Sequence, residues 1–336
     1  MKNLLYIGNK LSKTGKTVTT IETLSANFVA EGFKVKSVSS IANKWFRFLD
    51  MLFAVIRYSK WADYVLIDTY STQNFYYAYA TSQLCRFFKL KYLPILHGGN
   101  LPKRLENSPK FSQAIFKNAY INIAPSKYTQ DAFKNQNINN VSVIPNSIIL
   151  KNYTFKPREI NTVKLLWVRS FSKLYNPKLA IDILNKLKHS NIESELCMVG
   201  PDNDGSLEET KQYAEELKLD VNFTGRLSKK EWIDLSKKSN VFINTTNFDN
   251  MPVSVIETMA LGLPVVSTNV GGLPYLINNN VNGVMVPAND ADAFVEAILN
   301  LKNNTKVTTE MIKNARKTAE QFQWHTVKEK WKNTLS

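Results

Sequence analysis

The sequence has 336 residues and a mass of 38.3 kDa, which is too much for one ordinary hydrophobic core and suits two domains. Hydrophobic residues make up 44% and charged residues 21%, near the averages of globular proteins, which argues against a disordered or fibrous protein. Residues 1–150 hold +12 of the formal net charge of +15, which indicates either an anionic partner, whether lipid headgroups, a diphospholipid-linked acceptor or nucleic acid, or only a lysine-rich solvated surface.

In the first half, short apolar runs alternate with segments of helical length. The runs that we expect to form strands are Asn3–Ile7, Phe33–Val38, Tyr64–Ile67, Tyr92–Leu96, Ile121–Ala124 and Val141–Ile144. Such alternation predicts a parallel sheet that binds ligands at the carboxyl ends of its strands. The aromatic and cationic segment 43–57 is typical of a crossover helix on the sheet or of a helix in a membrane interface. The need for a crossover there favours the first.

A polar, proline-containing segment at 151–162 interrupts this pattern and predicts a linker. Six further strands are expected beyond it, at Val163–Val168, Leu196–Val199, Val221–Thr224, Val241–Asn244, Pro264–Ser267 and Gly283–Val286. We therefore predict an α/β protein with two doubly wound Rossmann-like domains facing a cleft. The expected domains are 1–150 on the acceptor side and 163–315 on the donor side, with a C-terminal helix at 316–336 that can pack back on the first domain.

Targeting and redox signals favour a cytoplasmic protein. Cys85 and Cys197 lie in opposite halves without metal or redox spacing, which predicts reduced thiols. The first eight residues lack the apolar region and cleavage site of a signal peptide, and no apolar run reaches the roughly 18 residues of a membrane span. The basic first half predicts peripheral, reversible attachment to the inner face of the plasma membrane.

The most informative stretch is 247–268. It reads as a loop, a helix with Pro252 at its first position, a glycine stop and a buried strand. The N-terminus of that helix, Met251–Val253, offers unpaired N–H groups to a phosphate. Asp249 precedes the helix and Glu257 lies inside it, so two carboxylates can accept hydrogen bonds from the hydroxyls of one ligand.

This stretch resembles the donor-site signature of retaining GT-B glycosyltransferases of family four, also called glycosyl transferases group one. In that signature two acidic residues eight positions apart precede a Gly-x-Pro-Val-Val strand, here 262–266. The resemblance implies metal-independent, retaining transfer from a nucleotide sugar, with Glu257 on the ribose and Asp249 on the transferred sugar. Asp249 stands where the family usually has Glu.

Two further segments agree with the resemblance, each with a departure. Residues 143–147 resemble an apolar-Pro-Asn-Gly motif and so imply a donor-side role for Asn146, although Ser147 replaces the glycine. Residues 270–274 match another segment of the family, but Tyr275 stands where Glu is usual.

Four more site residues are implied by position. Arg169 ends a strand where the family places an arginine for the donor diphosphate, and Lys173 lies one residue nearer than the usual lysine. A fixed cation there stabilises the charge that develops on the leaving diphosphate. His97 corresponds to a histidine that approaches the transferred sugar, and Gly15 lies in the first strand-to-helix loop, at the donor or acceptor. The residues alone leave a surface cation and a structural histidine as alternatives.

Other chemistries find weaker support. The loop 8–17 fails the P-loop spacing because Lys10 stands where glycine is required, and Asp202-Asn203-Asp204 reads as a solvated turn. There is no zinc spacing, no dinucleotide glycine motif and no nucleic-acid motif. We therefore expect no metal and no cofactor, with a nucleotide-sugar donor and a glycan or lipid-linked acceptor as partners.

The sequence thus predicts a hexosyltransferase of polysaccharide, lipopolysaccharide or glycolipid synthesis. The departures at Asp249, Ser147 and Tyr275 leave two alternatives open. One is a non-catalytic partner subunit that binds sugar nucleotides. The other is a nucleotide-sugar epimerase, or a hydrolase that uses the two carboxylates as acid and base.

Overall fold

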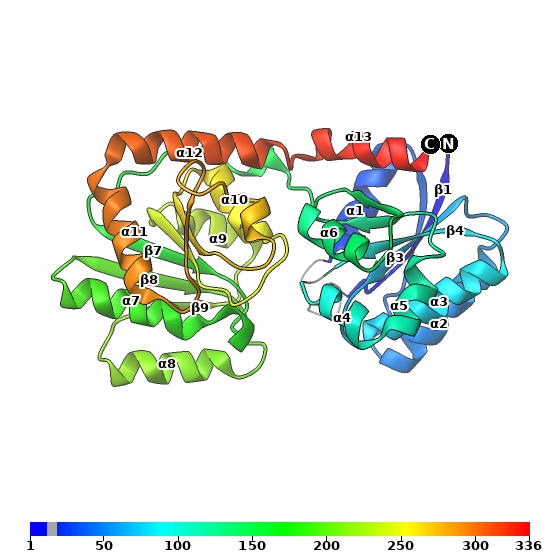
Figure 1. Ribbon diagram of the computed structural model, residues 1–336, viewed down its shortest axis with the longest axis horizontal. Coiled ribbons are helices and arrows are strands. Elements are labelled where there is room, and N and C mark those ends of the chain that lie inside the picture. Colours follow the sequence, from blue (N-terminus) through cyan, green and yellow to red (C-terminus); the bar gives the residue numbers. More distant parts are fainter. Residues whose placement is uncertain (12–18, 98) are drawn as a thin grey trace. The chain divides into compact units, whose positions relative to one another are not determined.

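The structure, a computed structural model, describes residues 1–11, 19–97 and 99–336. They form two α/β units, which are drawn in Figure 1. The first unit comprises Met1–Pro145 and Lys330–Ser336, and the second comprises Asn146–Glu329. No helix within the described ranges is long and apolar enough to cross a membrane.

The first unit is a parallel sheet whose strands lie in the order β2-β1-β3-β4-β5-β6. The strands are β1 (Asn3–Ile7), β2 (Lys34–Val38), β3 (Tyr64–Thr69), β4 (Lys91–Leu96), β5 (Asn122–Ala124) and β6 (Val141–Val143). The helices are α1 (Thr20–Ala30), α2 (Lys44–Arg57), α3 (Asn74–Phe87), α4 (Leu101–Asn107), α5 (Pro109–Phe116) and α6 (Lys127–Asn135). The strand order reverses beside β1, and ligands of open α/β sheets bind at such a point.

The second unit repeats this architecture, with the strand order β12-β11-β10-β7-β8-β9. Its strands are β7 (Val163–Val168), β8 (Ser194–Val199), β9 (Asn222–Gly225), β10 (Val241–Asn244), β11 (Val265–Thr268) and β12 (Val284–Val286). Its helices are α7 (Pro177–His189), α8 (Ser206–Glu216), α9 (Lys229–Ser236), α10 (Val253–Leu261), α11 (Ala291–Asn303) and α12 (Thr305–Glu320). The last helix, α13 (Trp324–Leu335), begins in this unit and belongs to the first unit from Lys330 onward. Here the order reverses between β7 and β10.

Both sheets are covered by helices on two faces, as the predicted fold class requires. In the first unit, α2 and α3 lie side by side on one face, while α1 lies on the other (Figure 1). In the second unit, α7 and α11 pack on one face of the sheet, and α10 and α12 pack on the other. The prediction that segment 43–57 is a crossover helix packed on the sheet is therefore confirmed.

The C-terminal tail is helical and serves packing, as its pattern predicts. Ile312 and Ala319 of α12 are fully buried in the second unit. In the first unit, the Trp331 ring of α13 meets the Phe28 ring edge to face at 5.2 Å, and the Lys332 ammonium lies 2.8 Å from Glu31. The last residues of the chain are thus held against α1 of the first unit.

One local prediction is wrong. Pro252 does not occupy the first position of α10 but caps it from outside, with an extended ψ of 114°. The helix itself begins at Val253. The glycine stop is present, because Gly262 adopts the left-handed conformation, with φ of +86°, that L side chains rarely adopt.

Candidate functional site

A buried polar cluster lies at the carboxyl ends of β1, β3 and β4 in the first unit. Its centre is Asp68, whose Oδ1 lies 2.7 Å from Nε2 of His97 and accepts a 2.8 Å hydrogen bond from the Tyr6 hydroxyl. The His97 ring stacks on Tyr70, with 4.8 Å between ring centroids. Burial and the nearby Asp68 carboxylate raise the pKa of Tyr6 well above its ordinary value, so its hydroxyl remains a donor.

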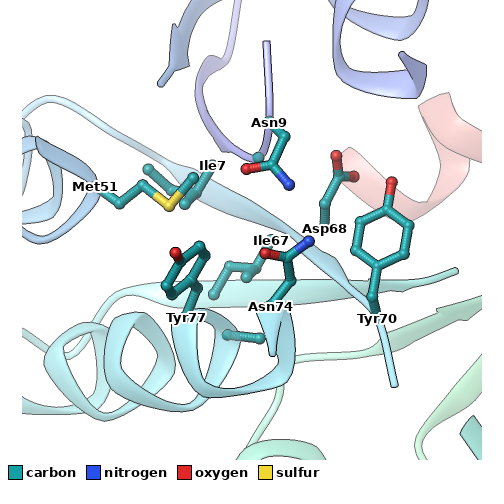
Figure 2. Close-up of a pocket in the computed structure, with 10 residues that line it drawn as sticks. Ile7, Asn9, Met51, Ile67, Asp68, Tyr70, Asn74 and Tyr77 are labelled. Atoms are coloured by element: carbon teal, nitrogen blue, oxygen red, sulfur yellow. The ribbon is translucent and has the colours of Figure 1, made fainter. Parts of the chain in front are cut away.

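The same carboxylate borders a small pocket, which is shown in Figure 2. Asn9 lines it from the loop after β1, and Asn74 and Tyr77 line it from α3. The backbone passes close to the carboxylate here, because a Cβ added to Gly8 would lie 2.4 Å from Oδ2 of Asp68. Among the described residues, this Oδ2 and Oδ1 of Asn9 are buried acceptors without a hydrogen-bond partner.

The geometry gives His97 a defined tautomer. An ionised carboxylate only accepts hydrogen bonds, so Nε2 carries the proton that faces Asp68 and Nδ1 is left for another contact. Asp68 therefore holds the His97 ring in place and fixes its tautomer. It was not predicted from the sequence, although a lone acidic residue inside the buried run Tyr64–Thr69 is a usable signal.

We expect Asp68→Asn to lower turnover about tenfold, because an amide can donate to Nε2 and so release the tautomer. Nitrogen-15 spectra of the histidine side chains would show whether Nε2 of His97 still carries the proton. Tyr6→Phe is the matched control, because it removes the other donor to the same oxygen and should cost less than about threefold. An unchanged His97 tautomer in Asp68→Asn would contradict the positioning role.

A second cluster lies at the carboxyl ends of β7 and β10 in the second unit. Arg169 follows β7, and its Nη2 donates to Oδ2 of Asp249 in an ion pair. The side chains of the two residues are only 12% and 15% exposed, so solvent screens the pair weakly. Nε of Arg169 also lies 3.4 Å from Oδ1 of Asn244, whose side-chain amide in turn donates to Oγ of Ser267 at 2.9 Å.

An aromatic ring completes the surroundings of the guanidinium. Arg169 lies over Tyr175, with 4.7 Å between the guanidinium carbon and the ring centroid. Burial is the main reason that the pKa of Tyr175 is raised, and Asp249 adds to the effect while Arg169 opposes it. Arg169 is thus oriented on three sides, by a carboxylate, an amide and a ring.

Two glycines explain how Asp249 reaches this position. A Cβ at Gly271 would lie 2.2 Å from the carbonyl oxygen of Asp249, and a Cβ at Gly272 would lie 1.9 Å from that of Asn250. The Gly272 N–H donates to the Asp249 carbonyl at 2.8 Å. The glycine pair of segment 270–274 therefore lets two loops approach closely enough to hold the acidic loop before α10.

Glu257 lies on α10 with its side chain 5% exposed. Its Oε1 accepts a 2.6 Å hydrogen bond from the Tyr153 hydroxyl and also meets the Lys229 ammonium. Burial and the Glu257 carboxylate raise the pKa of Tyr153, which keeps that donor protonated. Both contacts use one oxygen, and they leave Oε2 as the oxygen available to a ligand.

The other predicted residues are placed as follows. The Lys173 side chain is 73% exposed, and its ammonium lies 3.6 Å from Glu209 of α8. Asn146 is half-buried where the second unit begins, and Met251–Val253 form the entry to α10. Gly15 lies outside the described residues. Arg169, Asp249 and the start of α10 are therefore brought together, while the Lys173 ammonium is directed elsewhere.

Sequence reasoning missed several partners in the second unit, namely Asn244, Lys229 and Tyr153. Asn244 could have been recognised in the sequence as a polar amide that ends the apolar strand β10, and the structure shows it fully buried. The sequence offered no such pattern for Lys229 and Tyr153, because their contacts with Glu257 span 28 and 104 residues of sequence.

The acidic turn after β8 has a structural role. Oδ1 of Asp202 accepts from the Gly205 N–H at 3.1 Å, and Asp204 accepts from the backbone N–H of Ser206 at 3.3 Å. These contacts begin α8, in agreement with the predicted solvated turn. The described residues hold no group of three or more His, Cys, Asp or Glu side chains suited to a metal ion.

Two doubly wound α/β units with polar clusters at the carboxyl ends of their strands define the class of this protein, because ligands of such sheets bind at those strand ends. Residues 154–318 match the sequence model of the family described as glycosyl transferases group 1. Through this segment, the chain belongs to the glycosyl transferases group 1 family.

Curated relatives agree with this assignment. The chain is 26% identical over 194 residues to the Escherichia coli UDP-Gal:alpha-D-GlcNAc-diphosphoundecaprenol alpha-1,3-galactosyltransferase, a match that covers 52% of this chain and 48% of that protein. It is 30% identical over 203 residues to a component of human phosphatidylinositol N-acetylglucosaminyltransferase, covering 56% of this chain and 40% of that one. These matches span less than half the length of either relative.

The fold is shared over nearly the whole chain with proteins of low sequence identity. Sucrose-phosphate synthase from Thermosynechococcus elongatus superposes with a TM-score of 0.82 at 17% identity, covering 99% of this chain and 98% of that one. HepE from Anabaena, solved in complex with UDP-glucose, also has a TM-score of 0.82, at 18% identity and with coverages of 100% and 99%. The predicted fold class, two Rossmann-like domains with a helical C-terminus, is confirmed.

Proposed function

We propose that this protein is a retaining, metal-independent glycosyltransferase that moves a sugar from a nucleotide-sugar donor to a glycan or lipid-linked acceptor. The observation that carries the proposal is the Arg169–Asp249 pair beside the N-terminus of α10, with Glu257 about one helical turn further along that helix. This arrangement offers a cation and free backbone N–H groups to a diphosphate, and carboxylates to sugar and ribose hydroxyls. The names of the two curated relatives support a lipid-linked acceptor.

In the proposed reaction, the acceptor hydroxyl oxygen bonds to the anomeric carbon as the bond from that carbon to the diphosphate oxygen breaks. The hydroxyl proton passes to the departing diphosphate, and a nucleoside diphosphate is released. Arg169 stabilises the negative charge that grows on the leaving group, and its partners Asn244 and Tyr175 hold it in place beforehand. Asp249 contacts the transferred sugar, and Glu257 contacts the ribose through Oε2.

Ser254 adds support for a phosphate at α10. Its hydroxyl lies in the first turn of the helix and is buried without a hydrogen-bond partner among the described residues. A hydroxyl at that position can donate to the same phosphate as the backbone N–H groups.

The hydrolase alternative is disfavoured by the state of the two carboxylates. An acid and base pair requires one carboxylic acid to stay protonated. Asp249 is held in an ion pair with the guanidinium of Arg169, and Glu257 is held in one with the ammonium of Lys229. The carboxylates are therefore better suited to holding hydroxyl groups than to donating a proton.

The proposed setting is surface-polysaccharide, lipopolysaccharide or glycolipid assembly, with the protein in the cytoplasm or peripheral on the inner face of the plasma membrane. The basic first half supports an anionic acceptor or surface. A reaction whose leaving-group charge is met by a side chain does not require a metal ion.

Thermal-shift measurements with UDP-, GDP-, ADP- and CMP-sugars test the proposal, and each should be repeated in the presence of EDTA. We expect one donor to raise Tm equally with and without the chelator, because binding stabilises the folded state and no metal is needed. Nuclear magnetic resonance of the product formed with that donor reads the anomeric configuration. A rise in Tm without product formation from any native cell-envelope acceptor would favour the alternative of a non-catalytic partner subunit. A product of inverted anomeric configuration would contradict the proposed retaining reaction.

A further inference from the structure

The crossover helix α2 has a second face that the sheet does not cover. Five large apolar side chains on it are exposed, with exposed fractions of 48% to 78%. They are Trp45, Phe46, Leu49, Phe53 and Ile56, and we call them the α2 outer face. Single exposed apolar residues are ordinary, but five on about three turns of one helix are not.

These residues share one side of the helix. At about 100° per residue, their positions fall within an arc of about 100°. The buried residues Met51, Ala54 and Val55 lie on the opposite side and pack against the first sheet. Helix α2 therefore has two apolar faces, and only one of them is packed inside the unit.

The helix is firmly held in this orientation. The Asn43 side chain caps its N-terminus by accepting from the Trp45 N–H at 2.9 Å. The buried Arg47 guanidinium donates to the carbonyls of Ile41 and Ala42 at 3.0 and 3.1 Å. The Phe48 ring stacks on Tyr77 of α3, with 5.3 Å between centroids. The outer face is thus presented by a braced helix and not by a loose segment.

The charge of the surrounding unit limits what can cover this face. The residues of the first unit include 21 Lys and Arg against 7 Asp and Glu, a formal charge of +14. The second unit carries 22 against 21, which leaves only +1. Three exposed cations border the α2 outer face, namely Lys44 and Arg57 at the two ends of α2 and Lys60 beyond it.

We propose that the α2 outer face docks this protein on an anionic lipid bilayer, with its aromatic side chains inserted among the headgroups. Aromatic residues bordered by lysine and arginine suit that depth, where an apolar ring and a cation are both accommodated. A second copy of the chain suits the face poorly, because it would bring two units of +14 together. The inference rests on the exposed face and the charge, and it holds whether or not the proposed transferase activity does.

Flotation of the full chain with vesicles tests the proposal. We expect binding to vesicles with about 30% phosphatidylglycerol at about 50 mM salt, and much weaker binding to phosphatidylcholine alone or at about 500 mM salt. Trp45→Ser with Phe53→Ser should lower partitioning at least about tenfold, since two inserted rings are lost. Val281→Ser with Val307→Ser is the matched control, because it removes two exposed apolar residues, 45% and 60% exposed, from the second unit.

Brominated lipids distinguish insertion from surface attraction. Brominated lipids quench the fluorescence of a tryptophan that is inserted among them. Trp45→Phe keeps an aromatic ring on the α2 outer face but should lose most of the quenching of tryptophan fluorescence seen in the original chain. Equal flotation of the Trp45/Phe53 double variant and the original chain would overturn the proposal, as would the absence of vesicle binding at low salt. The proposal would also be overturned if the original chain is a dimer in lipid-free solution and the double variant is a monomer. A donor-induced shift in Tm that is unchanged in the double variant keeps this test separate from that of the proposed function.

Discussion

Arg169→Ala is expected to lower kcat about 10²–10³-fold, the usual cost of removing one preorganised group that stabilises developing charge. The guanidinium is bound by Asp249 and Asn244 and lies over the Tyr175 ring, so its position is set before a donor arrives. The substitution also leaves Asp249 unpaired beside the proposed diphosphate, where a carboxylate repels it. Single-turnover rates with a matched donor and acceptor measure the effect.

Lys173→Ala is the control for this prediction. Its ammonium lies beside Glu209 and the side chain is 73% exposed, so we expect a loss of less than about threefold. Arg169→Lys keeps the positive charge but loses the planar guanidinium with its paired donors, so its loss of kcat should lie between those of Arg169→Ala and Lys173→Ala. Equal losses in the Arg169 and Lys173 variants would contradict the assignment of the leaving-group contact to Arg169.

Glu257→Gln is expected to raise the donor Kd about 10–100-fold. The ribose contact proposed for Oε2 is a hydrogen bond to a charged group, worth about 1.5–3 kcal/mol net. The substitution keeps the volume of the buried side chain, and the amide oxygen still accepts from Tyr153. Lys229 is 51% exposed and can turn to solvent, so we expect little change in the free energy of unfolding.

Tyr153→Phe separates donor binding from support of the carboxylate. It removes the hydroxyl that donates to Oε1 and leaves Oε2 unchanged, so donor affinity should weaken by less than about fivefold. Isothermal titration with the donor identified by thermal shift measures both variants. Wild-type affinity in Glu257→Gln would contradict the ribose contact.

The sequence by itself was sufficient for the architecture. All twelve expected strands are present, and β1, β7 and β10 have the predicted bounds, because buried parallel strands read as short, nearly continuous apolar runs. The left-handed Gly262 and the α10 entry that follows the acidic loop were also recognisable from residue type and spacing. Local chemistry determines these features, so a local pattern reports them.

The tertiary structure decided which side chains meet. Asp68 is 29 residues from His97, and Arg169 is 80 residues from Asp249, so each pair forms only after the strand order brings two strand ends together. The same reason explains why Glu257 acquired two unpredicted partners and why the Lys173 ammonium did not join Arg169. For α2, the apolar pattern suited either a packed helix or an interfacial one, and packing against the sheet decided which of its two apolar faces is buried and which remains exposed.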